Sequence, residues 1–197
     1  MREVELKAVV PDEDALRRRL VAAGALPVFE GTLLDRRYDT AERALTQRDQ
    51  VLRLRVQRAA GGERVVLEFK GAASVVDGYK VREEVGTAVD DAQTMALILE
   101  SLGYRVTREV DRDIAVFALA GATVRLERYP RMDLLVEVEG EPAAIEAAIA
   151  ALGIPRAAFT AEPLVAFLSR YEARTGRRAA ICQRELANEF PFRADDA

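Results

Sequence analysis

The stretch EVELK at residues 3–7 decides the fold, because charged and apolar residues alternate along it. A period of two is the period of a β-strand, so we predict a strand with a charged face and an apolar face. Pro11 ends this strand, and apolar residues at helical spacing predict a helix over residues 14–23, which Gly24 ends.

The same alternation recurs along most of the chain. It predicts strands over residues 3–9, 31–39, 51–58, 64–71, 78–85, 104–119, 122–129 and 134–140. The pair Gly61-Gly62 predicts a hairpin turn between two of them. Further helices are expected over residues 90–102 and 141–152, and residues 162–189 are expected to be wholly helical apart from a break near Gly176. This order predicts an α+β fold with an antiparallel sheet of about eight strands.

The polar face of nearly every predicted strand is ionic. Its charged positions include Glu3, Glu5, Lys7, Arg53, Arg55, Glu68, Lys70, Lys80, Arg82, Glu84, Arg125, Glu127, Glu137 and Glu139. The simpler interpretation is an open sheet whose outer face is charged for solubility. Exposed strand positions usually favour Thr, Ser, Tyr and Val, however, and this face is almost purely Glu, Lys and Arg. We therefore favour a closed barrel with the charged face turned inward around a hydrated bore.

Composition narrows the chemistry. The chain has 197 residues, 50% hydrophobic and 31% charged, which indicates one folded domain with a helical appendage. A net charge of −4 gives no general attraction to nucleic acid or to an anionic membrane. Histidine is absent and Cys182 is the only cysteine, which excludes disulfides, Cys/His zinc sites and His-activated nucleophiles. Without a signal peptide or a long apolar run, we expect a cytoplasmic protein.

A lining that mixes both charges matches one class of ligand. Arginine and lysine bind phosphate oxygens, whereas clustered carboxylates hold a hard cation such as Mg²⁺ or Mn²⁺. A polyphosphate with its divalent ions uses both groups, so the sequence predicts a site for a metal–polyphosphate complex.

The order of these motifs resembles the CYTH domain family, the triphosphate tunnel metalloenzymes that include class IV adenylate cyclases and thiamine triphosphatases. The resemblance covers roughly residues 1 to 170. It is carried by the ExExK strand at residues 3–7 and, in order, by Tyr38-Asp39-Thr40, Leu52-Arg53-Leu54-Arg55, Leu67-Glu68-Phe69-Lys70-Gly71, Arg82-Glu83-Glu84, Arg125-Leu126-Glu127 and Leu135-Val136-Glu137-Val138-Glu139.

The resemblance implies a closed eight-stranded antiparallel barrel with flanking helices, whose tunnel binds a triphosphate with Mg²⁺ or Mn²⁺. The phosphate ligands it implies are Lys7, Arg53, Arg55, Lys70, Arg82, Arg112 and Arg125. The metal ligands it implies are Glu3, Glu5, Glu84, Glu127, Glu137 and Glu139. Lys7, Arg55 and Glu127 are its catalytic candidates, for the attack of a metal-oriented water on the terminal phosphoryl group.

Three departures from the family pattern bear on activity. The K-x-R pair that follows the central helix becomes Arg112 and Ile114, so one phosphate ligand is missing unless Arg108 replaces it after a register shift. The late Lys and Ser-Tyr are replaced by Glu162 and Pro163-Leu164. The His-Phe pair that precedes ExExK in bacterial class IV cyclases is absent, which argues against cyclisation.

The leading hypothesis is a metal-dependent hydrolase of inorganic triphosphate or of a small organic or nucleoside triphosphate. The alternatives are a class IV-type adenylate cyclase and a polyphosphate- or nucleotide-binding module with little turnover. We expect a tunnel domain over residues 1–175 and a C-terminal extension over residues 176–197. The expected partner is a small-molecule triphosphate, with no nucleic acid and no membrane, and a homodimer stays an open alternative.

Overall fold

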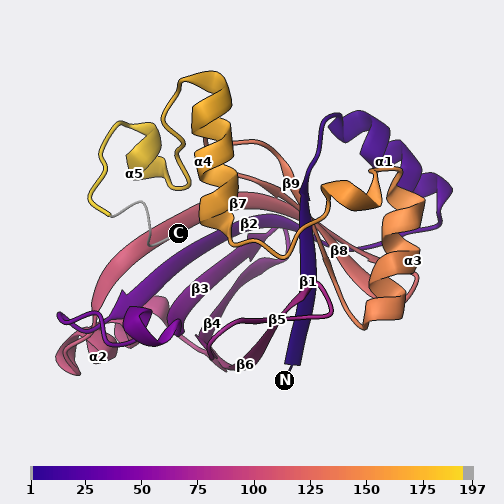
Figure 1. The fold of residues 1–197 in the computed structure, drawn as a ribbon. Helices are drawn as coiled ribbons and strands as arrows, with labels where there is room; N and C mark the ends of the chain where they lie inside the picture. Colours follow the sequence, from indigo (N-terminus) through magenta and orange to yellow (C-terminus); the bar gives the residue numbers. More distant parts are fainter. Residues whose placement is uncertain (1, 193–197) are drawn as a thin grey trace.

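The computed structural model describes residues 2–192 and contains one continuous antiparallel sheet (Figure 1). Its strands are β1 (Arg2–Val9), β2 (Leu26–Asp39), β3 (Val51–Ala59), β4 (Gly62–Lys70), β5 (Ser74–Val76), β6 (Tyr79–Val89), β7 (Arg105–Leu119), β8 (Ala122–Arg128) and β9 (Leu135–Glu139). The helices are α1 (Glu13–Ala22), α2 (Ala92–Ser101), α3 (Pro142–Leu152), α4 (Leu164–Thr175) and α5 (Gln183–Leu186), with short 3₁₀ turns at Thr46–Arg48 and Arg156–Ala158.

Strand β1 closes the sheet into a barrel by pairing with two different strands. Its first half pairs with β6, where Glu3 lies opposite Arg82, and its second half pairs with β9, where Lys7 lies opposite Glu137. The strand order around the barrel is β1-β9-β8-β7-β2-β3-β4-β6, and β5 pairs with β6 as an extra strand. The predicted closed eight-stranded antiparallel barrel is confirmed; β5 was not predicted.

Helices cover the apolar outer face of the barrel. Figure 1 shows α1 and α3 side by side at one end, and there Leu6, Val138 and Ile145 are fully buried in a shared core. A second core lies under α2, where Leu99 packs with Tyr38 and Leu54. Because the helices bury the apolar side of each strand, the charged side has only the bore to face.

Strand β2 is longer than predicted and begins at Leu26 instead of residue 31. The strand has a register shift between Pro27 and Phe29, which interrupts the alternation that marks a strand in the sequence. At Gly31 the chain passes so close to β3 that an added Cβ would lie 2.0 Å from the carbonyl oxygen of Arg58. Only glycine fits this contact.

The prediction of helix over residues 162–189 with a break near Gly176 is confirmed up to the break and wrong after it. Helix α4 ends at Thr175, where Gly176 takes a left-handed conformation with φ 65°, and helix resumes only in the four residues of α5. Between them Ala180 pairs with Arg131 in a β-bridge, and the Asp111 amide of β7 donates to the carbonyl oxygen of Ile181 at 2.7 Å. These bonds to the barrel replace those of a helix.

The segment after Gly176 therefore packs against the barrel. Ile181 and Cys182 are fully buried, and Ile181 packs in one cluster with Val110 of β7 and Tyr129. Within residues 2–192, no helix combines the length and the apolar character that a membrane crossing requires.

Candidate active site: a charged tunnel

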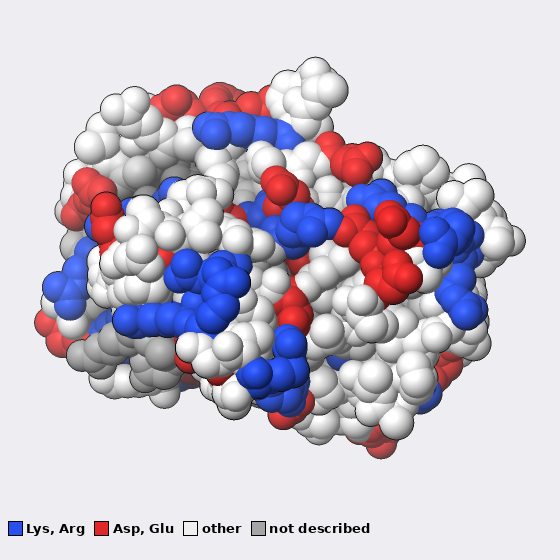
Figure 2. Space-filling model, turned by 90° about the horizontal axis from the view of Figure 1, so that it is seen from above, with Lys and Arg blue, Asp and Glu red and all other residues white. Residues whose placement is uncertain are grey.

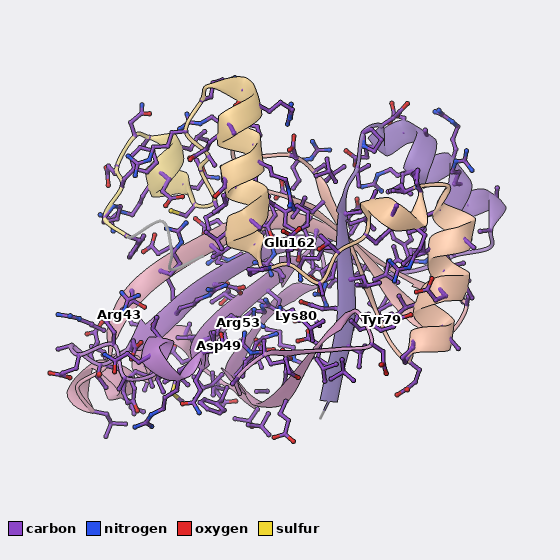
Figure 3. The ribbon with its side chains drawn as sticks, in the orientation of Figure 1. Arg43, Asp49, Arg53, Tyr79, Lys80 and Glu162 are labelled. Carbon is purple, nitrogen blue, oxygen red and sulfur yellow. The ribbon has the colours of Figure 1, made fainter. Side chains whose placement is uncertain are left out.

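A cavity of about 480 Å³ runs through the barrel, and all eight barrel strands contribute side chains to it. Every site residue expected from the sequence lies on its wall, namely Glu3, Glu5, Lys7, Arg53, Arg55, Lys70, Arg82, Glu84, Arg112, Arg125, Glu127, Glu137 and Glu139. Arg53 and Lys80 project from separate strands toward this bore (Figure 3). The alternative of a charged face turned to bulk solvent is therefore wrong.

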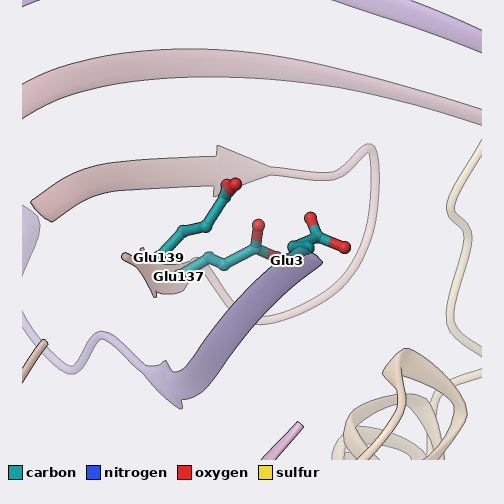
Figure 4. A group of neighbouring side chains, drawn as sticks. All are labelled: Glu3, Glu137 and Glu139. Atoms are coloured by element: carbon teal, nitrogen blue, oxygen red, sulfur yellow. The ribbon is translucent and has the colours of Figure 1, made fainter. Parts of the chain in front are cut away.

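One side of the tunnel carries clustered carboxylates from β1 and β9. Oxygens of Glu3, Glu137 and Glu139 all lie within 4.8 Å of one another (Figure 4). Glu137 also accepts from Lys7 at 2.7 Å and from Arg125 at 2.7 Å, and these cations hold its pKa below the usual range although burial opposes the shift. Three carboxylates at this spacing form an all-oxygen donor set, which suits Mg²⁺ or Mn²⁺.

Glu139 shows the electrostatic strain of this cluster. Burial raises its pKa to about 6, with the neighbouring carboxylates of Glu137 and Glu3 acting in the same direction and Arg125 against it. A divalent cation among these oxygens would relieve that repulsion. The residues present therefore fit the metal that the resemblance implies.

The facing side of the tunnel is built on Asp35 of β2. Arg55 binds this carboxylate through two hydrogen bonds of 2.7 and 2.8 Å, while Arg112 and Arg53 approach one of its oxygens at 3.0 and 3.3 Å. Burial opposes the charge on Asp35, but the three guanidinium groups hold its pKa well below 3.8. Each guanidinium has five N–H donors, so donors remain for a phosphate group.

Arg37 adds a fourth cation to this side of the tunnel, and it lies on β2, the strand of Asp35. It lines the tunnel, and burial together with the charge of Arg53 lowers its pKa to about 10. At neutral pH it is still charged. Its position strengthens the positive potential on this side of the bore.

Lys7 and Glu127 are both held by ion pairs. Lys7 bridges Glu5 at 2.5 Å and Glu137 at 2.7 Å on the acidic side. Glu127 accepts from Arg112 at 3.1 Å and from the Tyr129 hydroxyl at 2.6 Å, and Arg112 also contacts Asp35. Arg112 therefore links Glu127 to the group around Asp35.

Lys70 and Arg82 are held near the acidic side. Lys70 lies 3.2 Å from Glu3 and also contacts Glu84, and burial with the charge of Arg53 lowers its pKa to about 8. Arg82 donates to the backbone oxygens of Gly71 and Asp49.

The structure also shows where the residues that depart from the family pattern lie. Ile114 is buried opposite Glu127 of β8 and lies outside the tunnel lining, so it supplies no cation. Arg108 does not replace it, because its guanidinium pairs with Glu185 of α5 at 2.9 Å. Glu162 pairs with Arg170 at the base of α4 (Figure 3), while Pro163 and Leu164 line the tunnel.

Sequence reasoning missed several residues of this site. Asp35, Arg37 and Tyr129 received no role, Lys80 was seen only as a member of a charged face, and Glu68 only as part of that face and of the motif at residues 67–71. A signal was present, because Asp35 and Arg37 are two residues apart within the predicted strand 31–39 and so share one face of it.

Figure 2 shows basic and acidic side chains interspersed over the face of the molecule seen from above. The tunnel lining shows the same mixture, with ten basic and nine acidic residues.

Comparisons with known proteins agree with this geometry. A family model, the CYTH domain, matches residues 1–150. A search of curated proteins gave no match.

Solved structures share the fold at low identity. A candidate adenylate cyclase from Vibrio parahaemolyticus is 21% identical with a TM-score of 0.73, over 85% of this chain and 97% of that one. The PH1819 protein from Pyrococcus horikoshii is 22% identical with a TM-score of 0.71, over 85% of this chain and 98% of that one. HpAC1 from Hippeastrum is 18% identical with a TM-score of 0.62, over 86% of this chain and 95% of that one. It is a candidate adenylyl cyclase with a dominant triphosphatase activity.

Proposed function

This chain belongs to the CYTH domain family, and on that premise we propose that it is a divalent-metal-dependent hydrolase of triphosphate compounds. The observation that carries the proposal is that one bore holds both a cluster of carboxylates and a cluster of arginines. The three carboxylates lie on β1 and β9, and arginines of β3 and β7 converge on Asp35 of β2. A polyphosphate with its counterions matches both sides at once.

The near balance of charge in the lining supports a metal-loaded ligand. With ten basic and nine acidic residues, the tunnel has little excess charge to neutralise a free polyanion. A triphosphate whose charge is largely offset by divalent ions leaves the balance nearly unchanged. The tunnel therefore favours the metal complex over either component alone.

Different residues of the tunnel would bind the phosphate groups and the metal ion. Arg53, Arg55 and Arg112 would donate to phosphate oxygens while Asp35 keeps their guanidinium planes in position. Glu3, Glu137 and Glu139 would hold Mg²⁺ or Mn²⁺, which supplies Lewis-acid neutralisation of phosphate charge.

The reaction we propose is simple hydrolysis. The oxygen of a water molecule forms a bond to the terminal phosphorus, the anhydride P–O bond breaks, and the shortened phosphate chain leaves with the bonding electron pair. The water's proton passes to solvent. Lys7 and the arginines offset the charge that spreads over the phosphoryl oxygens in the transition state. No covalent nucleophile is needed.

The test is phosphate release from inorganic triphosphate, ATP and thiamine triphosphate with Mg²⁺ or Mn²⁺. We expect Glu139→Gln to lower the rate more than about 100-fold, since even outer-shell changes at metal sites cost 10–100-fold. Glu141→Gln is the matched control, because this exposed residue lies two positions further on, before α3.

The same assay separates the alternatives. Cyclic AMP and diphosphate as products of ATP would favour an adenylate cyclase, the activity named for the Vibrio structure. Tight triphosphate binding without phosphate release would favour a binding module, in line with Ile114 and Leu164 at positions where the family has polar ligands. Equal rates for the two glutamate variants would show that the carboxylate cluster is not the metal site.

A further inference from the structure

A second cavity, of about 420 Å³, lies beside the tunnel. We call it the side pocket. Arg43 and Thr107 line both cavities, so the two are adjacent. The rest of its wall comes from Ala41 in the loop after β2, from the first half of β7, from Arg184 of α5, and from Pro191 and Phe192. Figure 3 places Arg43 at the far end of the barrel from Tyr79, beyond Asp49 and Arg53.

The wall of the side pocket combines an aromatic face with guanidinium groups. Phe192 is half-buried, and the guanidinium carbon of Arg184 lies 5.9 Å from the centre of its ring. Arg105 is fixed in the wall by a hydrogen bond of 2.9 Å to the carbonyl oxygen of Ala41. An aromatic ring next to planar guanidinium groups forms a surface on which a flat ring can stack.

The charges that line the side pocket determine whether a cationic or an uncharged flat ring binds better. Arg43, Arg105 and Arg184 line the pocket together with Glu109. Arg43 lies 4.0 Å from Asp39 and Arg184 pairs with Glu189 at 3.0 Å, whereas Arg105 donates to a backbone oxygen and Glu109 pairs with Arg36 at 3.3 Å. The wall therefore keeps an excess of guanidinium donors, which disfavours a cationic ring such as a thiazolium and favours an uncharged ring that carries hydrogen-bond acceptors, because arginine can only donate.

We propose that the side pocket binds the base of a nucleoside triphosphate whose phosphate chain lies in the tunnel. This inference rests on the function proposed above and makes the substrate class more specific. Inorganic triphosphate leaves the side pocket unused, and thiamine triphosphate brings a positive charge to a basic wall. Of the three substrate classes left open by the sequence, only a nucleoside triphosphate fits both cavities.

The test compares KM for ATP, inorganic triphosphate and thiamine triphosphate in the wild type and three variants. In Phe192→Ala we expect the ratio of KM for ATP to KM for inorganic triphosphate to rise about tenfold, the usual effect of losing one stacking partner. Phe192→Trp should keep the wild-type ratio because it retains the aromatic face. Leu186→Ala is the control, since Leu186 lies on the same segment, is 39% exposed and is outside the side pocket.

The outcomes separate this inference from the proposed hydrolysis. An unchanged ratio in Phe192→Ala, or a lower wild-type KM for thiamine triphosphate than for ATP, would overturn the side-pocket assignment while phosphate release continued. If no compound released phosphate, hydrolysis itself would be wrong. The ratio would then be taken from dissociation constants for ATP and inorganic triphosphate, with the same expectation.

Discussion

Asp35 accepts hydrogen bonds from three arginines while only 1% of the residue is exposed. We expect Asp35→Asn to lower the free energy of unfolding by about 3–5 kcal/mol, because it leaves buried cations without their counterion. Urea denaturation at pH 7 measures this. Asp113→Asn, an exposed position on β7, is the control and should change stability by less than about 0.5 kcal/mol.

The effect of Asp35 has a defined pH window. Its folded-state pKa lies below the ordinary value of 3.8, so its stabilisation is complete above about pH 4 and is lost as the pH falls toward the folded-state pKa. The stability gap between wild type and Asp35→Asn should therefore stay constant from pH 8 to pH 5 and shrink only below pH 4. A gap that narrowed between pH 8 and pH 5 would contradict this assignment.

At the scale of single residues, the sequence reveals which side chains enter the tunnel but not how they pair. Alternation placed Lys7, Arg55 and Glu137 on inward faces, and the structure lines the tunnel with all three. The role of Asp35 depends on register across three strands, since it lies opposite Arg55 on β3 and Val110 on β7. The alternation within one strand does not determine which of its residues lie opposite which residues of another strand.

Among the elements, the segment after α4 is held to the barrel by contacts with distant parts of the chain. Glu185 joins it to β7 through Arg108 at 2.9 Å and accepts from the Ile181 amide at 2.8 Å, with both charged side chains almost fully buried. We expect Glu185→Gln to cost about 3 kcal/mol of stability, because the buried Arg108 loses its charge partner. Urea denaturation measures the loss.

Hydrogen exchange locates the effect of that substitution. The amide of Asp111, which donates to Ile181, should exchange faster in Glu185→Gln, while the amides of β8 should change only with global stability. Glu189→Gln is the control, because Glu189 forms an exposed pair with Arg184. Uniform acceleration across β7 and β8 would mean that the segment is not held locally by Glu185.

The same segment shows why elements differ in how well the sequence predicts them. Most of the strands alternate over the predicted ranges, and each predicted strand is present, although β2 and β6 extend beyond the predicted ends. Residues 177–182 contain apolar and basic residues at a spacing that suits a helix. Their backbone groups bond instead to Arg131 and Asp111, which are contacts with distant residues that no local pattern reveals.

For the whole molecule, closure by β1 is what turns a charged sheet face into a binding site. Because β1 pairs with both β6 and β9, it brings Glu3 and Glu5 next to Lys80 and Glu139 and completes the bore. A charged lining could be inferred from the sequence, and closure could be inferred because the polar strand faces carry Glu, Lys and Arg in place of the Thr, Ser, Tyr and Val usual on an open sheet. The side pocket could not, since its walls come from a loop, a strand and the C-terminal segment.

Charge balance over the whole tunnel leads to a prediction about ligand stabilisation. Since ten basic and nine acidic residues line the bore, Mg²⁺ alone or inorganic triphosphate alone disturbs the balance, whereas both together restore it. At saturating concentrations of both ligands, about 100 times the dissociation constant, we expect about 2.7 kcal/mol of stabilisation, or a rise in Tm of about 5–10 °C. The rise should exceed the sum of the two separate shifts.

Thermal melts in the four ligand conditions measure this coupling, with sodium chloride at matched ionic strength as the control for screening. Glu139→Gln should reduce the excess, because it removes one of the three clustered carboxylates while leaving Arg53, Arg55 and Arg112 in place. Additive shifts in the wild type would mean that cation and phosphate bind independently. The acidic and basic sides of the tunnel would then not serve one ligand.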